Sequence, residues 1–219
     1  LVNTSFTESE KELSQTGRRF SYELSCLAGL QRAARITQGN NAYTALAADF
    51  VAPAYIPYVR FIFEKAEELG IKRLYFLSRD SYILLKIAEQ MQGEYPGIEL
   101  KYLFVSRKAL LLPYMQGADA EKFLAVQDKQ TLIGKSTEEL LNSLGTTRVE
   151  LEERYSIRIG YSKIANRHEE EDFLHKIFGE KSDFRHHLQE TAKEKRIILN
   201  DYFEQEGVFG DVKSAMVDV

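Results

Sequence analysis

The sequence LYFLSRDSYILLKIA, residues 74–88, decides the expected fold. Leu74 to Leu77 is a short apolar run with the aromatic content of a buried strand. Four polar residues, 78–81, follow directly, and from Tyr82 onward apolar residues recur at helical spacing. A polar cluster between two apolar elements fits the rim of a core, where a strand ends and a helix begins. This stretch therefore predicts a strand, a loop and a helix, with Asp80 or Ser81 as the helix N-cap.

The same order recurs along the chain. Residues 100–105 (LKYLFV) read as a second strand, which ends in a polar cluster at 106–108 before an apolar helix from Ala109. Residues 216–219 read as a third strand that contains Asp218. Strands separated by helices predict a parallel sheet. We therefore expect an α/β fold, a three-layer Rossmann-like sheet with a large helical insertion.

Helical spacing and breakers suggest the domain organisation. We expect an N-terminal helical and linking segment over 1–42, in which 1–17 is a polar link and 20–36 is a helix. One or two long helices over 43–69, broken near Pro53 and Pro57, would lead into the sheet. The α/β core would comprise 43–117 and 210–219, and a helical subdomain would comprise 118–209. Because the chain starts at Leu1 and stops in an apolar strand, we expect a piece of a longer polypeptide.

Composition narrows the class of protein. The 219 residues are 44% hydrophobic and 28% charged, and the net charge of −4 argues against nucleic acid as a partner. The single cysteine, Cys26, fits a reducing compartment, so we expect a cytoplasmic protein. We see no apolar run of the roughly 18 residues that a spanning helix needs, so no membrane span is expected.

The predicted sheet places three polar clusters at one edge, because ligands of parallel sheets bind beyond the carboxyl ends of the strands. Arginine and lysine at this edge would bind a phosphorylated small molecule. The expected ligand-binding residues are Ser78, Arg79, Ser81, Ser106, Arg107 and Lys108. Asp80 and Asp218 are the candidate catalytic acids. They would also bind sugar hydroxyls or a metal ion. Mg²⁺ is the candidate cofactor, and no set of metal ligands is assigned to it. The competing interpretation is an Asp N-cap, an Arg79 paired with a neighbouring acid, and a solvated basic turn at 106–108.

Other motifs are weaker. Residues 133–137 (IGKST) resemble the end of a phosphate-binding loop, but that pattern needs a glycine at position 129, which is Lys129. A helix N-cap at Ser136 or Thr137 explains the same residues. Cys26 fits an apolar helix face in the core. The histidines have no metal-ligand spacing and fit a solvated helix face: His168, His175, His186 and His187.

The run LGIKRLYFLSRDSYILLKIAEQM, with LKYLFVSRKALLLP after it, resembles predicted hydrolases of the haloacid dehalogenase (HAD) superfamily that accompany cell-surface polysaccharide biosynthesis. These proteins commonly carry a strand ending in R-D-G, and Ser81 stands here where that glycine is usual. The superfamily's D-x-D-x-T nucleophile motif does not occur in this sequence. The resemblance therefore implies a module beside the phosphatase domain, binding a phosphosugar or nucleotide-sugar.

Three alternatives stay open. A non-catalytic module would scaffold a neighbouring phosphatase or glycosyltransferase domain, with 118–209 as the partner surface. A phosphoribosyltransferase-like domain would share the order of strands and polar clusters, but its usual paired acids are not visible. A complete HAD phosphatase would need an acid pair that the sequence lacks.

Overall fold

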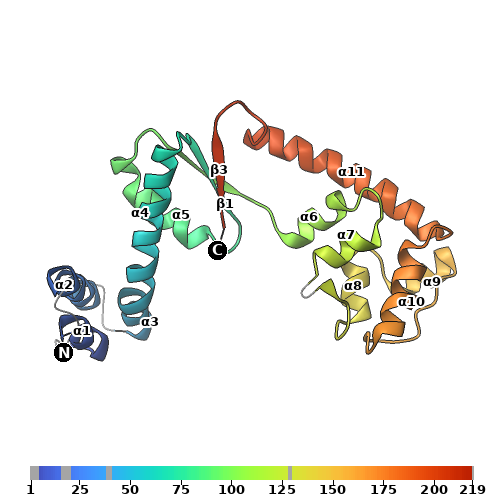
Figure 1. Cartoon of the computed structure of the whole chain (residues 1–219), viewed down its shortest axis with the longest axis horizontal. Helices are drawn as coiled ribbons and strands as arrows, with labels where there is room; N and C mark the ends of the chain where they lie inside the picture. Colours follow the sequence, from blue (N-terminus) through green and yellow to red (C-terminus); the bar gives the residue numbers. More distant parts are fainter. Residues whose placement is uncertain (1–4, 16–20, 38–40, 128–129, 219) are drawn as a thin grey trace. The chain divides into compact units, whose positions relative to one another are not determined.

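The computed structural model describes residues 5–15, 21–37, 41–127 and 130–218. It is a mixed α/β structure, 64% helical, and divides into two compact units (Figure 1). Unit 1 comprises Leu1–Tyr102 and Val212–Val219, and unit 2 comprises Leu103–Asp211. We expected a helical subdomain over 118–209, and the helical unit 2 starts earlier in the chain because the helix after residue 106 belongs to it.

Unit 1 is built on a small parallel sheet of three strands. These strands are β1 (Arg73–Leu77), β2 (Glu99–Leu103) and β3 (Ser214–Val217), in the order β2-β1-β3. The register of β1 with β3 runs from Arg73 opposite Ser214 to Phe76 opposite Val217. The predicted parallel sheet is thus confirmed. The third strand was expected at 216–219, but it ends at Val217, so Asp218 directly follows the strand and does not lie within it.

Two helices cover the face of the sheet that carries Leu74 and Phe76: α4 (Ala52–Glu68) and α5 (Tyr82–Met91) (Figure 1). The ring of Tyr95, which follows the short 3-10 helix η2 (Gln92–Glu94), stacks on Phe63 with 4.4 Å between centroids. Burying each such side chain contributes roughly 1.5–3 kcal/mol, so this layer holds the sheet. Its buried helical residues are Val59, Phe63, Ala66, Leu84, Leu85, Ala88 and Met91.

A continuous helical run leads into the sheet. It starts with α3 (Ala42–Leu46), passes through a π-helical segment, η1 (Ala47–Val51), and continues as α4. The break expected near Pro53 and Pro57 is not found, because α4 starts just before Pro53 and continues through Pro57. The run departs from α-helical geometry before these prolines, in the π-helical segment. Gly70, with φ of +68°, follows the end of α4 as expected of a helix C-cap.

The run Ala42–Glu68 is long and apolar enough to span a membrane by length and composition. No apolar run of this length was expected from the sequence. Residues 42–59 form one because Asp49 is the lone charged residue among them. One such helix is weak evidence for a span. Several of its large apolar side chains are exposed: Tyr43, Leu46, Phe50, Ile56, Tyr58 and Phe61.

The N-terminal segment holds two helices, α1 (Glu8–Gln15) and α2 (Ser21–Thr37). The expectation of a polar link over 1–17 is wrong for 8–15, because Glu10 is buried in an ion pair with Arg35 of α2. The expectation of a core Cys26 is also wrong. Ala28, Gln31 and Arg35 form the buried face of α2, and Cys26 lies exposed on the opposite side of the helix.

Unit 2 contains six helices in its described part, 103–127 and 130–211: α6 (Arg107–Tyr114), α7 (Ala120–Ala125), α8 (Thr137–Ser143), α9 (Arg148–Tyr155), α10 (Arg167–Phe178) and α11 (Asp183–Glu206). Five of them begin with a side-chain N-cap, from Ser106, Asp119, Ser136, Thr147 and Asn166. Their shared core includes Leu111, Met115, Phe123, Leu132, Leu140, Leu151, Phe173, Ile177 and Phe184. Such caps fix where each helix starts and so which face it buries.

Candidate functional site

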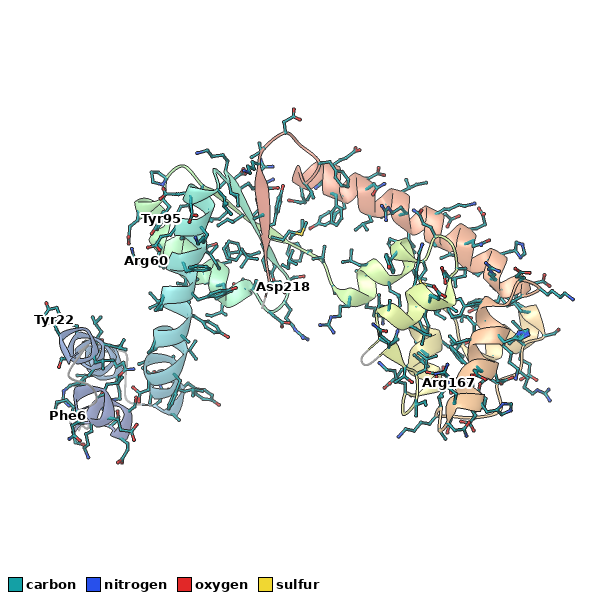
Figure 2. All side chains as sticks on the ribbon, in the orientation of Figure 1. Phe6, Tyr22, Arg60, Tyr95, Arg167 and Asp218 are labelled. Carbon is teal, nitrogen blue, oxygen red and sulfur yellow. The ribbon has the colours of Figure 1, made fainter. Side chains whose placement is uncertain are left out.

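The turn after β1 is fastened to the end of β3. Ser81 is completely buried, and its Oγ donates a hydrogen bond of 2.8 Å to the backbone oxygen of Val217. The Ser81 amide donates to the Leu77 oxygen at 3.2 Å, which closes the turn. Asp218 follows Val217 directly (Figure 2). The structure therefore brings the 78–81 turn and Asp218 to the same edge of the sheet.

The strand order makes this edge a topological switch point. From β1 the chain passes through α5 to β2 on one side, whereas β3 lies on the other side of β1. The strand order thus reverses between β1 and β3, and parallel sheets bind ligands beyond the strand ends at such a reversal. The 78–81 turn and Asp218 occupy the two strand ends that define this point.

Arg79 and Asp80 are presented to solvent at this edge. The side chain of Arg79 is 93% exposed and that of Asp80 is 58% exposed, with 3.2 Å between Arg79 Nε and Asp80 Oδ1. This is the paired arginine of the competing interpretation. An exposed pair of this kind contributes only about 0–1 kcal/mol, so an anionic ligand can displace the carboxylate from the guanidinium at little cost.

The expected N-cap of α5 takes a different form. Ser81 occupies the N-cap position, but its side chain makes no capping hydrogen bond because the hydroxyl is committed to Val217. Asp80 lies one residue before the cap. The turn thus contains a buried structural serine, Ser81, an exposed charged pair, and the half-buried Ser78 directly after β1.

The second predicted cluster belongs to unit 2. Ser106 caps α6, its Oγ accepting from the Ala109 amide at 3.1 Å. Arg107 and Lys108 line a pocket of about 240 Å³ whose other residues all come from unit 2. Arg79, Asp80 and Asp218 belong to unit 1. The polar clusters that the sequence analysis assigned to one site are therefore parts of two compact units.

Lys135 is a pocket residue that the sequence analysis assigned no role. It lies in the IGKST stretch, in a turn where Gly134 has φ of +88°. Ser136 caps α8 by accepting from the Glu139 amide at 3.5 Å, as the helix-cap interpretation predicts. The IGKST motif was the sequence feature that could have indicated a role for Lys135. It was set aside as a nucleotide-binding loop because the first glycine of that pattern is missing.

The remaining candidates show no metal centre within the described residues. His168, His175, His186 and His187 are exposed on helices, as expected. Across 5–15, 21–37, 41–127 and 130–218, no three His, Cys, Asp or Glu side chains are grouped to hold a metal ion. The acids at the switch point, Asp80 and Asp218, could thus supply only part of a coordination shell.

Comparison of the sequence with protein-family models finds no match, and comparison with curated proteins finds none either. The resemblance to HAD-superfamily hydrolases accordingly rests on sequence motifs alone, those of residues 69–112 and the approach to Asp218 in 197–219.

Proposed function

We propose that this chain is an α/β module that binds a phosphorylated metabolite, such as a phosphosugar or nucleotide-sugar, beyond the carboxyl ends of β1 and β3. The observation that carries the proposal is the hydrogen bond from Ser81 to Val217, which holds the Arg79-Asp80 turn beside Asp218. Arg79 supplies the cation for the phosphate, and Asp80 and Asp218 supply acceptors for sugar hydroxyls.

Chemistry and topology both support this assignment. A guanidinium presents a planar fork of donors that matches two phosphate oxygens, and the Arg79 guanidinium pairs with the exposed carboxylate of Asp80. Asp80 and Asp218 are also the candidate catalytic acids of this edge. An Mg²⁺ ion that accompanies the phosphate would contact one of these two carboxylates.

The finer parts of the proposal follow from the resemblance. We propose a Rossmann-like sheet in a cytoplasmic hydrolase of the HAD type, with this chain as the module beside the phosphatase domain. The ligand class then follows from cell-surface polysaccharide metabolism, in which phosphosugars and nucleotide-sugars are the activated building blocks.

A thermal-shift screen tests the proposal with phosphosugars and nucleotide-sugars, with and without Mg²⁺. A ligand at about 100 times its Kd stabilises the folded state by about 2.7 kcal/mol. We expect the shift to disappear in Arg79→Gln. Arg60→Gln is the matched control, because Arg60 is an exposed, ion-paired arginine of the same unit (Figure 2). Absence of any shift, or equal loss in the two variants, would contradict the proposal.

One observation favours the scaffold as a second candidate function. The exposed apolar side chains of α3, η1 and α4 form the kind of surface that partner domains cover. This surface belongs to unit 1, not to 118–209. Replacing Phe50 and Phe61 by serine should then weaken association with a neighbouring phosphatase or glycosyltransferase domain and leave phosphosugar binding unchanged.

A further inference from the structure

An apolar pocket of unit 1 lies between α2 and the helical run that leads into the sheet. Its volume is about 360 Å³, within the roughly 300–1,000 Å³ that small-molecule sites occupy. Leu27 of α2, Ala48 of η1 and Ile56 of α4 are among the residues that line it. Gln31 is the one polar side chain in the described lining. The pocket therefore suits the carbon chain of a ligand that carries a single polar group.

The amide of Gln31 is held in one orientation by the π-helical segment. Pro53 has no amide hydrogen to donate to the Asp49 oxygen, four residues before it. The Gln31 Nε2 donates a hydrogen bond of 3.2 Å to this oxygen. Because the nitrogen of the amide is committed to η1, Gln31 Oε1 is the end of the side chain that is left to accept a hydrogen bond.

This oxygen is buried without a donor. Gln31 is only 3% exposed, and its Oε1 has no hydrogen-bond partner among the residues that the structure describes. Buried polar atoms nearly always have a partner, so an unpartnered acceptor on a pocket residue indicates a donor that comes with a ligand. Burial of an ammonium group in an apolar lining costs far more than burial of a hydroxyl. The donor that fits is therefore a neutral one.

We propose that this pocket binds a neutral aliphatic alcohol, whose hydroxyl donates to Gln31 Oε1 and whose carbon chain packs between α2 and α4. The chain enters from solvent at the rim, where Leu30 and Ile56 are 69% and 45% exposed. The site is separate from the switch point, because none of its described lining residues belongs to the 78–81 turn or to β3.

Calorimetric titration of the full chain with octanol and with its isomer heptyl methyl ether tests the proposed hydrogen bond. The two molecules have the same atoms, but only the alcohol has a donor. We expect the alcohol to bind about fivefold more tightly, as the net contribution of one hydrogen bond predicts. Gln31→Met removes the acceptor and keeps the length of the side chain. It should abolish the preference for the alcohol and leave the affinity for the ether nearly unchanged.

The position of the ligand is tested by filling the pocket. Ala52→Leu adds carbon to the lining and should weaken binding of both molecules about tenfold, since the added side chain takes the place of the ligand chain. Ala54→Leu is the matched control: Ala54 is exposed on the same helix, outside the described lining, and its replacement should leave both affinities unchanged. In NMR spectra the amides of Ala34 and Ala48 should shift on addition of octanol.

Three results would overturn the inference. The first is no binding of octanol, or equal affinities for the alcohol and the ether in the unmodified chain. The second is a preference for the alcohol that persists in Gln31→Met. The third is equal loss of binding in Ala52→Leu and Ala54→Leu, or loss of binding in Phe50→Ser, because Phe50 is exposed outside the described lining and its involvement would mean adsorption to the apolar surface.

Discussion

The hydroxyl of Ser81 and the carbonyl of Val217 are joined by a buried hydrogen bond of 2.8 Å across 136 positions of the sequence. This bond links the β1–α5 turn to the end of β3, beside their backbone pairing. It therefore determines where Asp218 lies relative to Arg79 and Asp80. The edge that we propose as a binding site depends on a residue that cannot itself be a ligand, because its side chain is completely buried.

Ser81→Ala should destabilise unit 1 by about 1–2 kcal/mol, because it removes a buried hydrogen bond and leaves its acceptor without this donor. Hydrogen exchange at the β3 amides is the measurement, since it reports opening of this edge alone. Ser25→Ala, on the exposed side of α2, is the control and should leave β3 unchanged. Unaltered exchange at β3 in Ser81→Ala would show that strand pairing alone holds the edge.

The strands and their order of appearance were predictable from the sequence. Short apolar runs that end in polar clusters mark β1 and β2, and helix caps such as Ser106 and Ser136 are local signals. The role of Ser81 was not predictable, because its acceptor lies 136 residues away. The local sequence favours Ser81 as a side-chain cap of α5. In the structure its hydroxyl instead donates a long-range hydrogen bond to Val217.

The candidate site was only partly predictable for a related reason. The sequence shows that charged clusters follow strands, but not which compact unit each cluster joins. Arg107 and Lys108 follow β2 in sequence and still belong to unit 2 with Lys135. Cys26 shows the same limit: its helix has apolar residues on several sides, and the buried Glu10–Arg35 pair decides which side faces inward.

Arg35 should be the most sensitive residue of the N-terminal helices. It is nearly fully buried, with Nε 3.1 Å from Glu10 Oε1 and Nη2 2.8 Å from the Ser5 oxygen. Arg35→Met removes the buried ion-pair partner of the Glu10 carboxylate, which keeps the Thr7 amide at 2.9 Å and the Arg32 guanidinium at 3.9 Å, so we expect a loss of up to about 3–5 kcal/mol in urea unfolding. The double variant Glu10→Leu/Arg35→Met should recover much of this loss. A double variant as unstable as Arg35→Met would refute the pairing argument.

Glu170 should stabilise the turn that precedes Lys135. Its buried Oε1 accepts from the Leu132 amide at 2.6 Å and from the Thr131 hydroxyl at 2.7 Å. Glu170→Ala leaves the Leu132 amide without its acceptor, so we expect the free energy of unfolding of unit 2 to fall by about 2–3 kcal/mol. Glu170→Gln keeps an acceptor oxygen and should cost less. Equal losses would mean that the negative charge, not the acceptor, holds the turn.

Asp49 should make the stability of unit 1 depend on pH. Burial raises the pKa of its carboxyl, and the negative charge of Glu10 raises it further. Asp49 Oδ1 is buried without a hydrogen-bond partner among the described residues. Because the folded state holds this proton more tightly, the unfolded state ionises first as the pH rises above about 3.8, and folding stability falls until the raised pKa is passed.

Asp49→Asn removes this loss, so its Tm should exceed that of the unmodified chain at pH 7 and match it near pH 3. Thermal unfolding followed by circular dichroism at both pH values is the measurement, with the exposed Asp201→Asn as control. An Asp49→Asn variant that is less stable at pH 7 would show that the ionised carboxylate is stabilising, and that the Thr7 hydroxyl, whose Oγ1 lies 3.4 Å from Asp49 Oδ2, outweighs burial.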